Sequence, residues 1–274
     1  MKIIYIGGYQ SFLRADQALD TAFYRSDQVG DPSISFSDVK HSIVILSTSF
    51  VLKDPKISLV RLMQKVDHLT TNIIQRLEPK GLIYVSSAAV YGLRESSQGI
   101  KEDSDLAGAT IYAQEKILFE QKMVKLSVGK FDLVVVRPSA FVGRFKESNP
   151  SLVDKCILSL ANKTEPKLKI ELGGLQMRDF CDWNDYVEAI RLLTVRLKNK
   201  QSKEKKECLK LNLSSLQPIC IRNLLRNFGI KFELSDVPSG SKIHLVLNTE
   251  LAIELEVMPK KRQIADWIET LRCF

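Results

Sequence analysis

Cysteine and histidine are scarce and scattered in this sequence, which argues against two common ways of stabilising a fold. The chain has 274 residues, of which five are cysteine and three are histidine. No two cysteines form a C-x-x-C pair, and no histidine has acidic neighbours in a metal-binding pattern. We therefore expect free thiols rather than a disulfide framework, and no metal site. The residues concerned are Cys156, Cys181, Cys208, Cys220, Cys273, His41, His68 and His244.

Long apolar runs are also missing. No segment approaches the roughly 18 apolar residues that a membrane-spanning helix needs. The first apolar segment, residues 2–6, follows the initiator Met directly, and we therefore expect no signal peptide. We expect no membrane insertion and a cytoplasmic location.

A basic excess is present but concentrated. The formal net charge is +8, and much of it lies in residues 198–210, which contain two glutamates and no aromatic residue. Such a run is typical of a solvated helix end and loop, and nucleic-acid binding is the weaker interpretation because no aromatic side chains are interleaved. We expect no nucleic-acid partner. An anionic small substrate or a membrane surface could use the same charge.

Apolar, β-branched segments alternate with helical patterns in the first half of the chain. Alternation of this kind predicts an α/β fold whose doubly wound parallel sheet is covered by helices on both faces. Ligands bind at the carboxyl ends of the strands in such sheets. The predicted strands are 2–6, 42–47, 81–87 and 131–137, and the predicted helices are near 11–22, 57–77 and 111–127.

The pattern loosens beyond about residue 145. We expect a dinucleotide-binding and catalytic region over 1–145 and a smaller α/β lobe, mainly substrate-binding, over 146–274. The lobe's predicted helices are 151–161, 184–197, 219–228 and 260–271, and its predicted strands are 168–172, 208–213 and 242–247.

Three residues carry the clearest chemistry. Ser87 ends the apolar segment 81–87, while Tyr112 and Lys116 lie four apart in a helical segment, and therefore on one helix face. A nearby cation favours the phenolate, so Tyr112 could exchange a proton near neutral pH, with Ser87 holding a substrate oxygen. A Tyr–Lys pair at this spacing is also common as surface packing.

The surrounding motifs resemble the extended short-chain dehydrogenase/reductase family, in its nucleotide-sugar epimerase, dehydratase and reductase branch. Residues 82–92, LIYVSSAAVYG, are similar to the family's catalytic-serine strand, and residues 112–116 match its Y-x-x-x-K. Residues 135–143, VVRPSAFVG, and 174–185, GLQMRDFCDWND, resemble later family segments. The resemblance covers nearly the whole chain and implies a Rossmann-type fold.

The resemblance implies a role for each catalytic residue. Tyr112 would exchange a proton with a sugar hydroxyl while hydride moves between the same carbon and NAD or NADP. Lys116 would lower the pKa of Tyr112 and hold the nicotinamide ribose. Ser87, followed by Ala88, would contact the substrate oxygen.

The family's cofactor fingerprint, G-x-x-G-x-x-G, is only partly present. Its glycines correspond to Gly7, Gln10 and Leu13, so two positions carry bulk where the family has none. Asp27 is our candidate for the acid that binds the ribose, and the neighbouring Arg25 could instead favour a 2′-phosphate. The residues expected at the cofactor are Gly7, Gly8, Gln10, Leu13, Asp27, Lys116, Arg137 and Pro138.

Two further positions bear on the substrate. Arg178 is the candidate for the nucleotide diphosphate, because a guanidinium offers a fork of donors to phosphate; an ion pair with Asp179 or Asp182 is the alternative. Ala140 stands where many family epimerases carry Asn. This leaves room for a 4-ketoreductase, and the absence of acids beside Ser87 ranks a dehydratase third.

We therefore expect an NAD(P)-dependent nucleotide-sugar epimerase or 4-ketoreductase. As relatives in this family commonly dimerise, we also expect a homodimer whose interface includes the helix that bears Tyr112. The alternative is a cofactor-impaired relative that acts as a non-enzymatic binding or scaffold subunit. A third hypothesis is a reductase that acts on a non-sugar carbonyl.

Overall fold

The described residues of this computed structural model form two units. They are residues 2–7, 21–92, 99–108, 110–143, 151–162, 164, 168–170, 174–201, 205–234 and 244–271. The first unit comprises Met1–Val90, Leu106–Arg137 and Val187–Leu211, and the second comprises Tyr91–Asp105, Pro138–Tyr186 and Asn212–Phe274. The chain thus passes between the units several times. A single boundary at residue 145 stays a prediction.

The first unit is built on a six-stranded sheet with the order β2-β1-β3-β4-β5-β9. All neighbouring pairs among the first five of these strands are parallel, which confirms the predicted α/β fold. The strands are β1 (Ile3–Gly7), β2 (Thr21–Tyr24), β3 (Ile43–Ser47), β4 (Gly81–Val85), β5 (Asp132–Pro138) and β9 (Cys208–Leu213).

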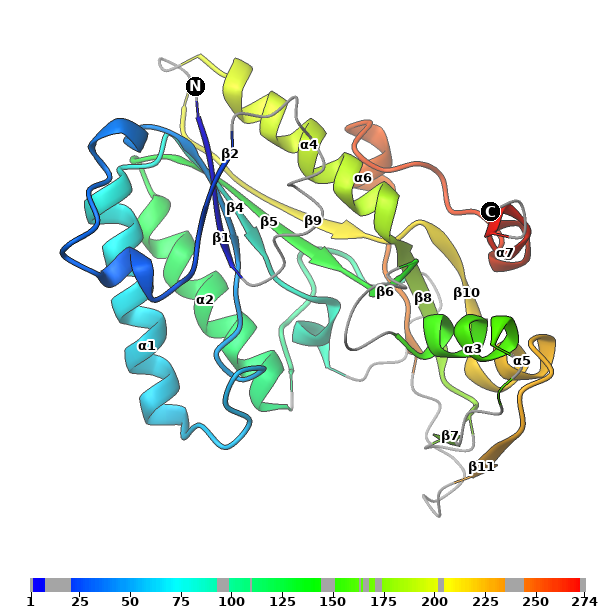
Figure 1. Cartoon of the computed structure of the whole chain (residues 1–274). Coiled ribbons are helices and arrows are strands. Elements are labelled where there is room, and N and C mark those ends of the chain that lie inside the picture. Colours follow the sequence, from blue (N-terminus) through cyan, green and yellow to red (C-terminus); the bar gives the residue numbers. More distant parts are fainter. Residues whose placement is uncertain are drawn as a thin grey trace. The chain divides into compact units, whose positions relative to one another are not determined.

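Helices cover both faces of this sheet. Helices α1 (Leu59–Asn72) and α2 (Ile111–Ser127) pack side by side on one face (Figure 1). The C-terminal part of α4 (Trp183–Asn199) packs on the other face, where Leu197 approaches Gly81 of β4. Both α1 and α2 begin at a capping hydroxyl: Ser58 accepts from the backbone N–H of Arg61, and Thr110 accepts from that of Ala113.

The core of this unit follows the two-residue period of the strands. One alternating set, including Ile4, Val44, Tyr84 and Val135, joins the buried faces of α1 and α2 in a single apolar cluster. The other set, including Ile3 and Ile83, is equally buried. Strands that are apolar on both faces are typical of a parallel sheet covered on both sides.

Short helical turns complete the first unit. A π-helical turn over Ile73–Leu77 extends α1, and 3₁₀ turns cover Gln28–Gly30 and Ser37–Val39. A further 3₁₀ turn, Ala88–Tyr91, begins in this unit and ends at the first residue of the second.

The second unit is smaller and mixed. Strand β8 (Met177–Asp182) runs antiparallel to β10 (Leu216–Cys220) and parallel to β6 (Ala140–Val142) and β12 (His244–Leu245). Strands β7 (Leu168–Ile170) and β11 (Phe232–Leu234) form a separate parallel pair. Its helices are α3 (Leu152–Ala161), α5 (Ile221–Asn227), α6 (Glu250–Glu254) and α7 (Ile264–Leu271). Phe180, Leu216 and Trp267 belong to its apolar core.

Several predicted elements, including the helix predicted over 260–271, were wrong at their ends, and two of them show a physical reason. The helix predicted near 11–22 cannot include Thr21 and Ala22, because both belong to β2 and pair with Ile3 and Ile4. The helix predicted over 219–228 begins only at Ile221, since the two residues before it are the end of β10. In both cases strand pairing overrides a local helical pattern. Residues 8–20 lie outside the described part of the chain.

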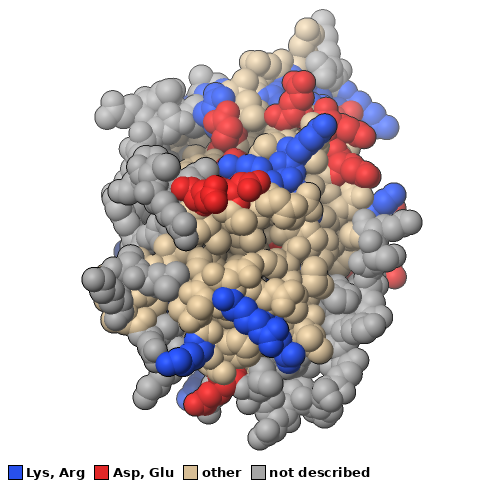
Figure 2. Space-filling view, turned by 90° about the vertical axis from the view of Figure 1, so that its right-hand side faces the viewer, with Lys and Arg blue, Asp and Glu red and all other residues tan. Residues whose placement is uncertain are grey.

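The lysine-rich run folds back on one carboxylate. Asp132 of β5 is buried and pairs with Lys200 at 2.8 Å and with Lys206 at 3.4 Å. Burial opposes ionisation of Asp132, but hydrogen bonds from Lys200 and from the N–H of Glu207 outweigh it and hold its pKa below the usual value. On the face shown in Figure 2, basic and acidic side chains are interspersed.

None of the described helices is both long and apolar enough to cross a bilayer.

Candidate active site

The carboxyl edge of the first unit's sheet contains a topological switch point. The chain runs from β1 to β2 on one side, then returns to β3 on the other side of β1. Gly7 ends β1 opposite Ser47, and a Cβ atom at Gly7 would lie 1.9 Å from the Ser47 carbonyl oxygen. Only glycine permits this approach. A crevice at such a point is where open α/β sheets bind ligands.

Ser87 lies just beyond the end of β4, two residues after Val85. Its Oγ accepts a hydrogen bond of 3.2 Å from the N–H of Ala89, and its carbonyl accepts one from the N–H of Val90. Ala88 is buried and begins the 3₁₀ turn, whereas Ser87 is only partly buried. The hydroxyl is therefore fixed at the carboxyl edge of the sheet.

The first turn of α2 packs against the segment that follows Ser87. A Cβ atom at Gly108 would lie 2.4 Å from Cβ of Ala113 and 3.2 Å from the carbonyl oxygen of Ala89, so the glycine allows this contact. Ala107 also donates its N–H to the carbonyl of Val90. These contacts bring the start of α2, with Tyr112 in its first turn, to the same edge of the sheet as Ser87.

Lys116 is buried, with 4% of its surface exposed. Its Nζ donates to the carbonyl oxygen of Thr48 at 2.9 Å and to that of Val85 at 3.0 Å. The same Nζ lies 5.7 Å from the ring centroid of Tyr112. An ammonium has three protons, and the third has no acceptor among the residues that the structure describes. The carbonyls that end β3 and β4 thus hold the cation beside Tyr112.

Burial lowers the pKa of Lys116 to about 8, although the carboxylates of Glu115 and Glu120 act in the opposite direction. The side chain therefore stays mainly charged at neutral pH.

A second tyrosine near Lys116 is excluded as the proton donor. The ring of Tyr84 lies 5.4 Å from Nζ, but Tyr84 is fully buried. Burial and the nearby carboxylates of Glu115 and Glu120 raise its pKa well above 10. Tyr112 is only partly buried, so of the two phenols it is the one with access to a substrate.

Two buried carboxylates fix α2 on the sheet edge. Glu115 accepts hydrogen bonds from the hydroxyl of Ser49 and the N–H of Phe50, which follow β3. Glu120 accepts from the hydroxyl of Ser86 at 2.5 Å and from the guanidinium of Arg137. We did not predict the role of Glu115, because a helical glutamate carries no sequence signal that distinguishes a buried residue from a solvated one.

The predicted cofactor residues occupy different places. Arg137 is buried near the end of β5, with its guanidinium bound to Glu120, and Pro138 ends that strand. Asp27 lies three residues beyond β2, exposed and paired with Arg25 at 3.2 Å. Gly8, Gln10 and Leu13 lie outside the described residues, so their predicted role stays a prediction.

The predicted substrate residues of the second unit lie on neighbouring strands. Ala140 begins β6 opposite Phe180 of β8, and Arg178 lies two positions earlier on β8. Burial lowers the pKa of Arg178. The Asp179 carboxylate acts on the Arg178 pKa in the opposite direction to burial and also binds Lys261 at 2.8 Å, while Asp182 accepts from the indole N–H of Trp267.

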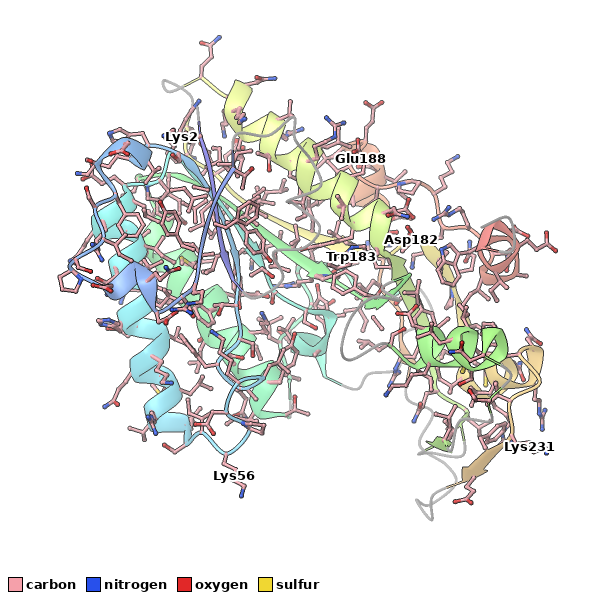
Figure 3. The ribbon with its side chains drawn as sticks, in the orientation of Figure 1. Lys2, Lys56, Asp182, Trp183, Glu188 and Lys231 are labelled. Carbon is pink, nitrogen blue, oxygen red and sulfur yellow. The ribbon has the colours of Figure 1, made fainter. Side chains whose placement is uncertain are left out.

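The join between β8 and α4 is also well fixed. Figure 3 shows Asp182 and Trp183 where the strand ends and the helix begins. Asp182 accepts the N–H of Asn184 at 2.9 Å, and the ring of Trp183 packs edge-on against Phe141, with 5.0 Å between centroids.

Within the described residues, no three His, Cys, Asp or Glu side chains gather where they could hold a metal ion. The first unit instead presents a hydroxyl, a phenol and a buried ammonium at the switch-point edge of a parallel sheet. That set suits proton exchange with an alcohol or ketone.

The family model described as "NAD dependent epimerase/dehydratase family" matches residues 59–208, a span that includes Ser87, Tyr112 and Lys116. The chain belongs to this family. No curated protein sequence matches it.

Solved structures agree in fold at low sequence identity. Pal from Bacillus thuringiensis is 16% identical with a TM-score of 0.73, covering 99% of this chain and 100% of that one. UDP-glucose 4-epimerase from Brucella ovis, in complex with NAD, is 16% identical with a TM-score of 0.72, covering 95% and 94%. RMD from Pseudomonas aeruginosa, complexed with NADPH, is 18% identical with a TM-score of 0.69, covering 95% and 94%.

Proposed function

We propose that this protein is an NAD(P)-dependent epimerase or 4-ketoreductase of nucleotide sugars. The observation that carries the proposal is Lys116, whose buried ammonium is bound to two strand-end carbonyls and lies 5.7 Å from the ring centroid of Tyr112. A cation held in this way stabilises a phenolate, and its cost in desolvation suggests a functional role.

Each residue of the set has a distinct task. Tyr112 takes the proton of a sugar hydroxyl in the oxidative direction and returns it in the reductive direction. Ser87 donates a hydrogen bond to the same substrate oxygen. Lys116 stabilises the phenolate and offers its third proton to a ribose hydroxyl.

The residues of the first unit fit a dinucleotide. Gly7 ends β1 at the switch point, where open α/β sheets bind ligands, and the third proton of Lys116 is available. The dinucleotide, when bound, supplies and accepts the hydride.

The sugar specificity rests on weaker support. Named structural neighbours include a UDP-glucose 4-epimerase and a UDP-N-acetylglucosamine 4-epimerase, but their identities to this chain are 16% and 17%. We propose Arg178 as the group that binds the diphosphate, because its guanidinium can offer paired donors to phosphate oxygens. Ala140 in place of Asn favours keto reduction over a UDP-galactose type of epimerisation.

A homodimer and a cytoplasmic location belong to the same proposal. Helix α1 exposes Leu59, Val60 and Met63, with 67% of Val60 accessible, and an apolar helix face of this kind suits a second copy. The described cysteines Cys156, Cys181, Cys208 and Cys220 are free thiols, as suits a reducing compartment.

The competing function is a non-enzymatic binding or scaffold subunit. Gln10 and Leu13 favour it, because they add bulk at two positions where the family fingerprint has glycine.

Two measurements decide between these functions. Titration with NAD(H) and NADP(H), followed by nicotinamide fluorescence, is expected to show binding below the millimolar range; absence of binding for all four rejects the redox proposal. Incubation with UDP-, dTDP- and GDP-sugars and their 4-keto forms then identifies the substrate.

Tyr112→Phe is expected to lower turnover at least 100-fold without changing the fold. Tyr84→Phe, a matched loss of a phenol hydroxyl near Lys116, is expected to retain activity.

A further inference from the structure

A hollow opens on the first unit where β2 ends. Its volume is about 840 Å³. We call it the β2 hollow, and three segments form it: the turn after β2, the loop after β3 and the N-terminal half of α1. Its lining residues are Arg25, Ser26, Asp27, Gly30, Asp31, Phe50, Lys53, Arg61, Gln64, Lys65, His68 and Leu69.

The strand register places this hollow at the carboxyl edge of the sheet. Ile6 of β1 pairs with Tyr24 of β2, so Arg25 follows at the level of Gly7. Ser47 pairs with Gly7 on the other side, and Phe50 lies three residues further on. The hollow therefore begins beside the switch point, where the adenosine half of a dinucleotide would extend toward the end of β2.

Basic side chains dominate the lining. Arg25, Lys53, Arg61 and Lys65 contribute four positive charges, against two carboxylates from Asp27 and Asp31. Hydrogen bonds from the hydroxyl and the N–H of Ser33 occupy the Asp31 carboxylate and hold its pKa below the usual value. With both carboxylates ionised, four cations against two anions still leave the lining net positive, which favours an anion.

Two of the cations are positioned by weak interactions, one a hydrogen bond and the other an exposed ion pair. Lys53 donates to the Oγ of buried Ser26 at 3.2 Å. Arg25 pairs with Asp27 at 3.2 Å, and about two thirds of each side chain is exposed. Solvent weakens that pair, so a dianion can recruit the guanidinium at little cost.

The charge of this lining distinguishes NADP from NAD. An NAD ribose presents only a neutral 2′-hydroxyl to this basic lining. A 2′-phosphate instead brings two negative charges to Arg25 and Lys53. A guanidinium and an ammonium both bind phosphate through charge-assisted hydrogen bonds. The 2′-phosphate can therefore form two strong hydrogen bonds that a neutral 2′-hydroxyl cannot match.

We propose that the β2 hollow binds the 2′-phosphate of NADP(H) through Arg25 and Lys53, so that this protein selects NADP(H) over NAD(H). The proposal rests on the proposed function, and it assigns the cofactor that the function leaves open.

Binding of adenosine fragments tests the proposal without any turnover. Adenosine 2′,5′-bisphosphate and adenosine 5′-monophosphate differ only in the 2′-phosphate, and calorimetry at low salt measures both. We expect the bisphosphate to bind at least tenfold more tightly, with a ratio that falls as salt is added. Arg25→Ala and Lys53→Ala should each lower that ratio three- to tenfold.

Lys56→Ala is the matched control. Lys56 belongs to the same loop as Lys53 and carries the same charge, but it does not line the hollow, and its side chain points away from the ribbon (Figure 3). Its removal should leave the ratio unchanged. A comparable loss in Lys56→Ala would attribute the ratio to general charge and overturn the proposal.

Titration of the intact protein with NADPH and NADH separates the two proposals. Tighter binding of NADPH, lost in the Arg25→Ala/Lys53→Ala double variant, supports the selection. Equal binding of both dinucleotides overturns it while the proposed redox function stands. Binding of neither dinucleotide overturns both.

Discussion

The Arg137 guanidinium binds the Glu120 carboxylate through two hydrogen bonds, from Nε at 3.0 Å and from Nη2 at 2.6 Å, and almost none of either side chain is exposed. The pair joins the middle of α2 to β5. Since Glu120 also accepts from Ser86, one carboxylate links α2 to the ends of two strands.

Glu120→Gln should lower the free energy of unfolding by about 3–5 kcal/mol, because it removes the carboxylate charge from a buried ion pair. Chemical denaturation followed by circular dichroism measures this. Asp67→Asn is the control, since Asp67 of α1 forms a more exposed pair with Lys122 of α2 and its loss should cost under about 1 kcal/mol. Equal losses in the two variants would show that burial does not set the strength of the pair.

Lys116→Met should remove one pH dependence of stability. The folded-state pKa is about 8, below the ordinary value of 10.5, so between these values the unfolded chain binds a proton that the folded chain does not. Wild-type stability should therefore rise relative to Lys116→Met by about 3 kcal/mol from pH 8 to pH 10.5, at about 1.4 kcal/mol per unit. Parallel denaturation curves for both proteins across this range provide the test, and a constant difference would contradict it.

Alanine substitutions of the neighbouring residues Ser86 and Ser87 should affect different properties, stability in the first case and turnover in the second. Ser87→Ala removes a partly buried hydroxyl at the proposed substrate oxygen and should lower turnover about 100-fold, with little effect on stability. Ser86→Ala removes a buried donor to Glu120 and should instead cost about 1–3 kcal/mol of stability, with less than a tenfold loss of turnover. Assays at a temperature where both variants remain folded separate these effects. The opposite pattern would assign the catalytic hydroxyl to Ser86.

Gly7→Ala should separate β1 from β3. The new Cβ atom would lie 1.9 Å from the Ser47 carbonyl oxygen. This contact is with strand backbone, which cannot move aside as a flexible side chain would. We expect a loss of about 3 kcal/mol in stability and weaker dinucleotide binding. Gly129→Ala is the contrasting case, because no atom lies within 4 Å and only its φ of +68° opposes a side chain, at about 1 kcal/mol. Thermal unfolding of the two variants compares these costs.

The strands of the first unit were predictable because burial on both faces leaves a local signature. Residues 43–47, 81–85 and 132–138 are apolar almost throughout, and each forms a strand of the parallel sheet. Strand β2 was not predictable in the same way. Its four residues are only partly buried, as expected at a sheet edge, so they lack that signature.

The sequence by itself determined the fold class and the spacing of Ser87, Tyr112 and Lys116, because both depend on local pattern and on the pitch of one helix. The tertiary structure decided what surrounds them. Lys116 binds Thr48, 68 residues away, and Arg137 of β5 binds Glu120 of α2. The β2 hollow likewise joins residues 25–31 to residues 50–69. Strand order brings these groups together, and no local spacing encodes strand order.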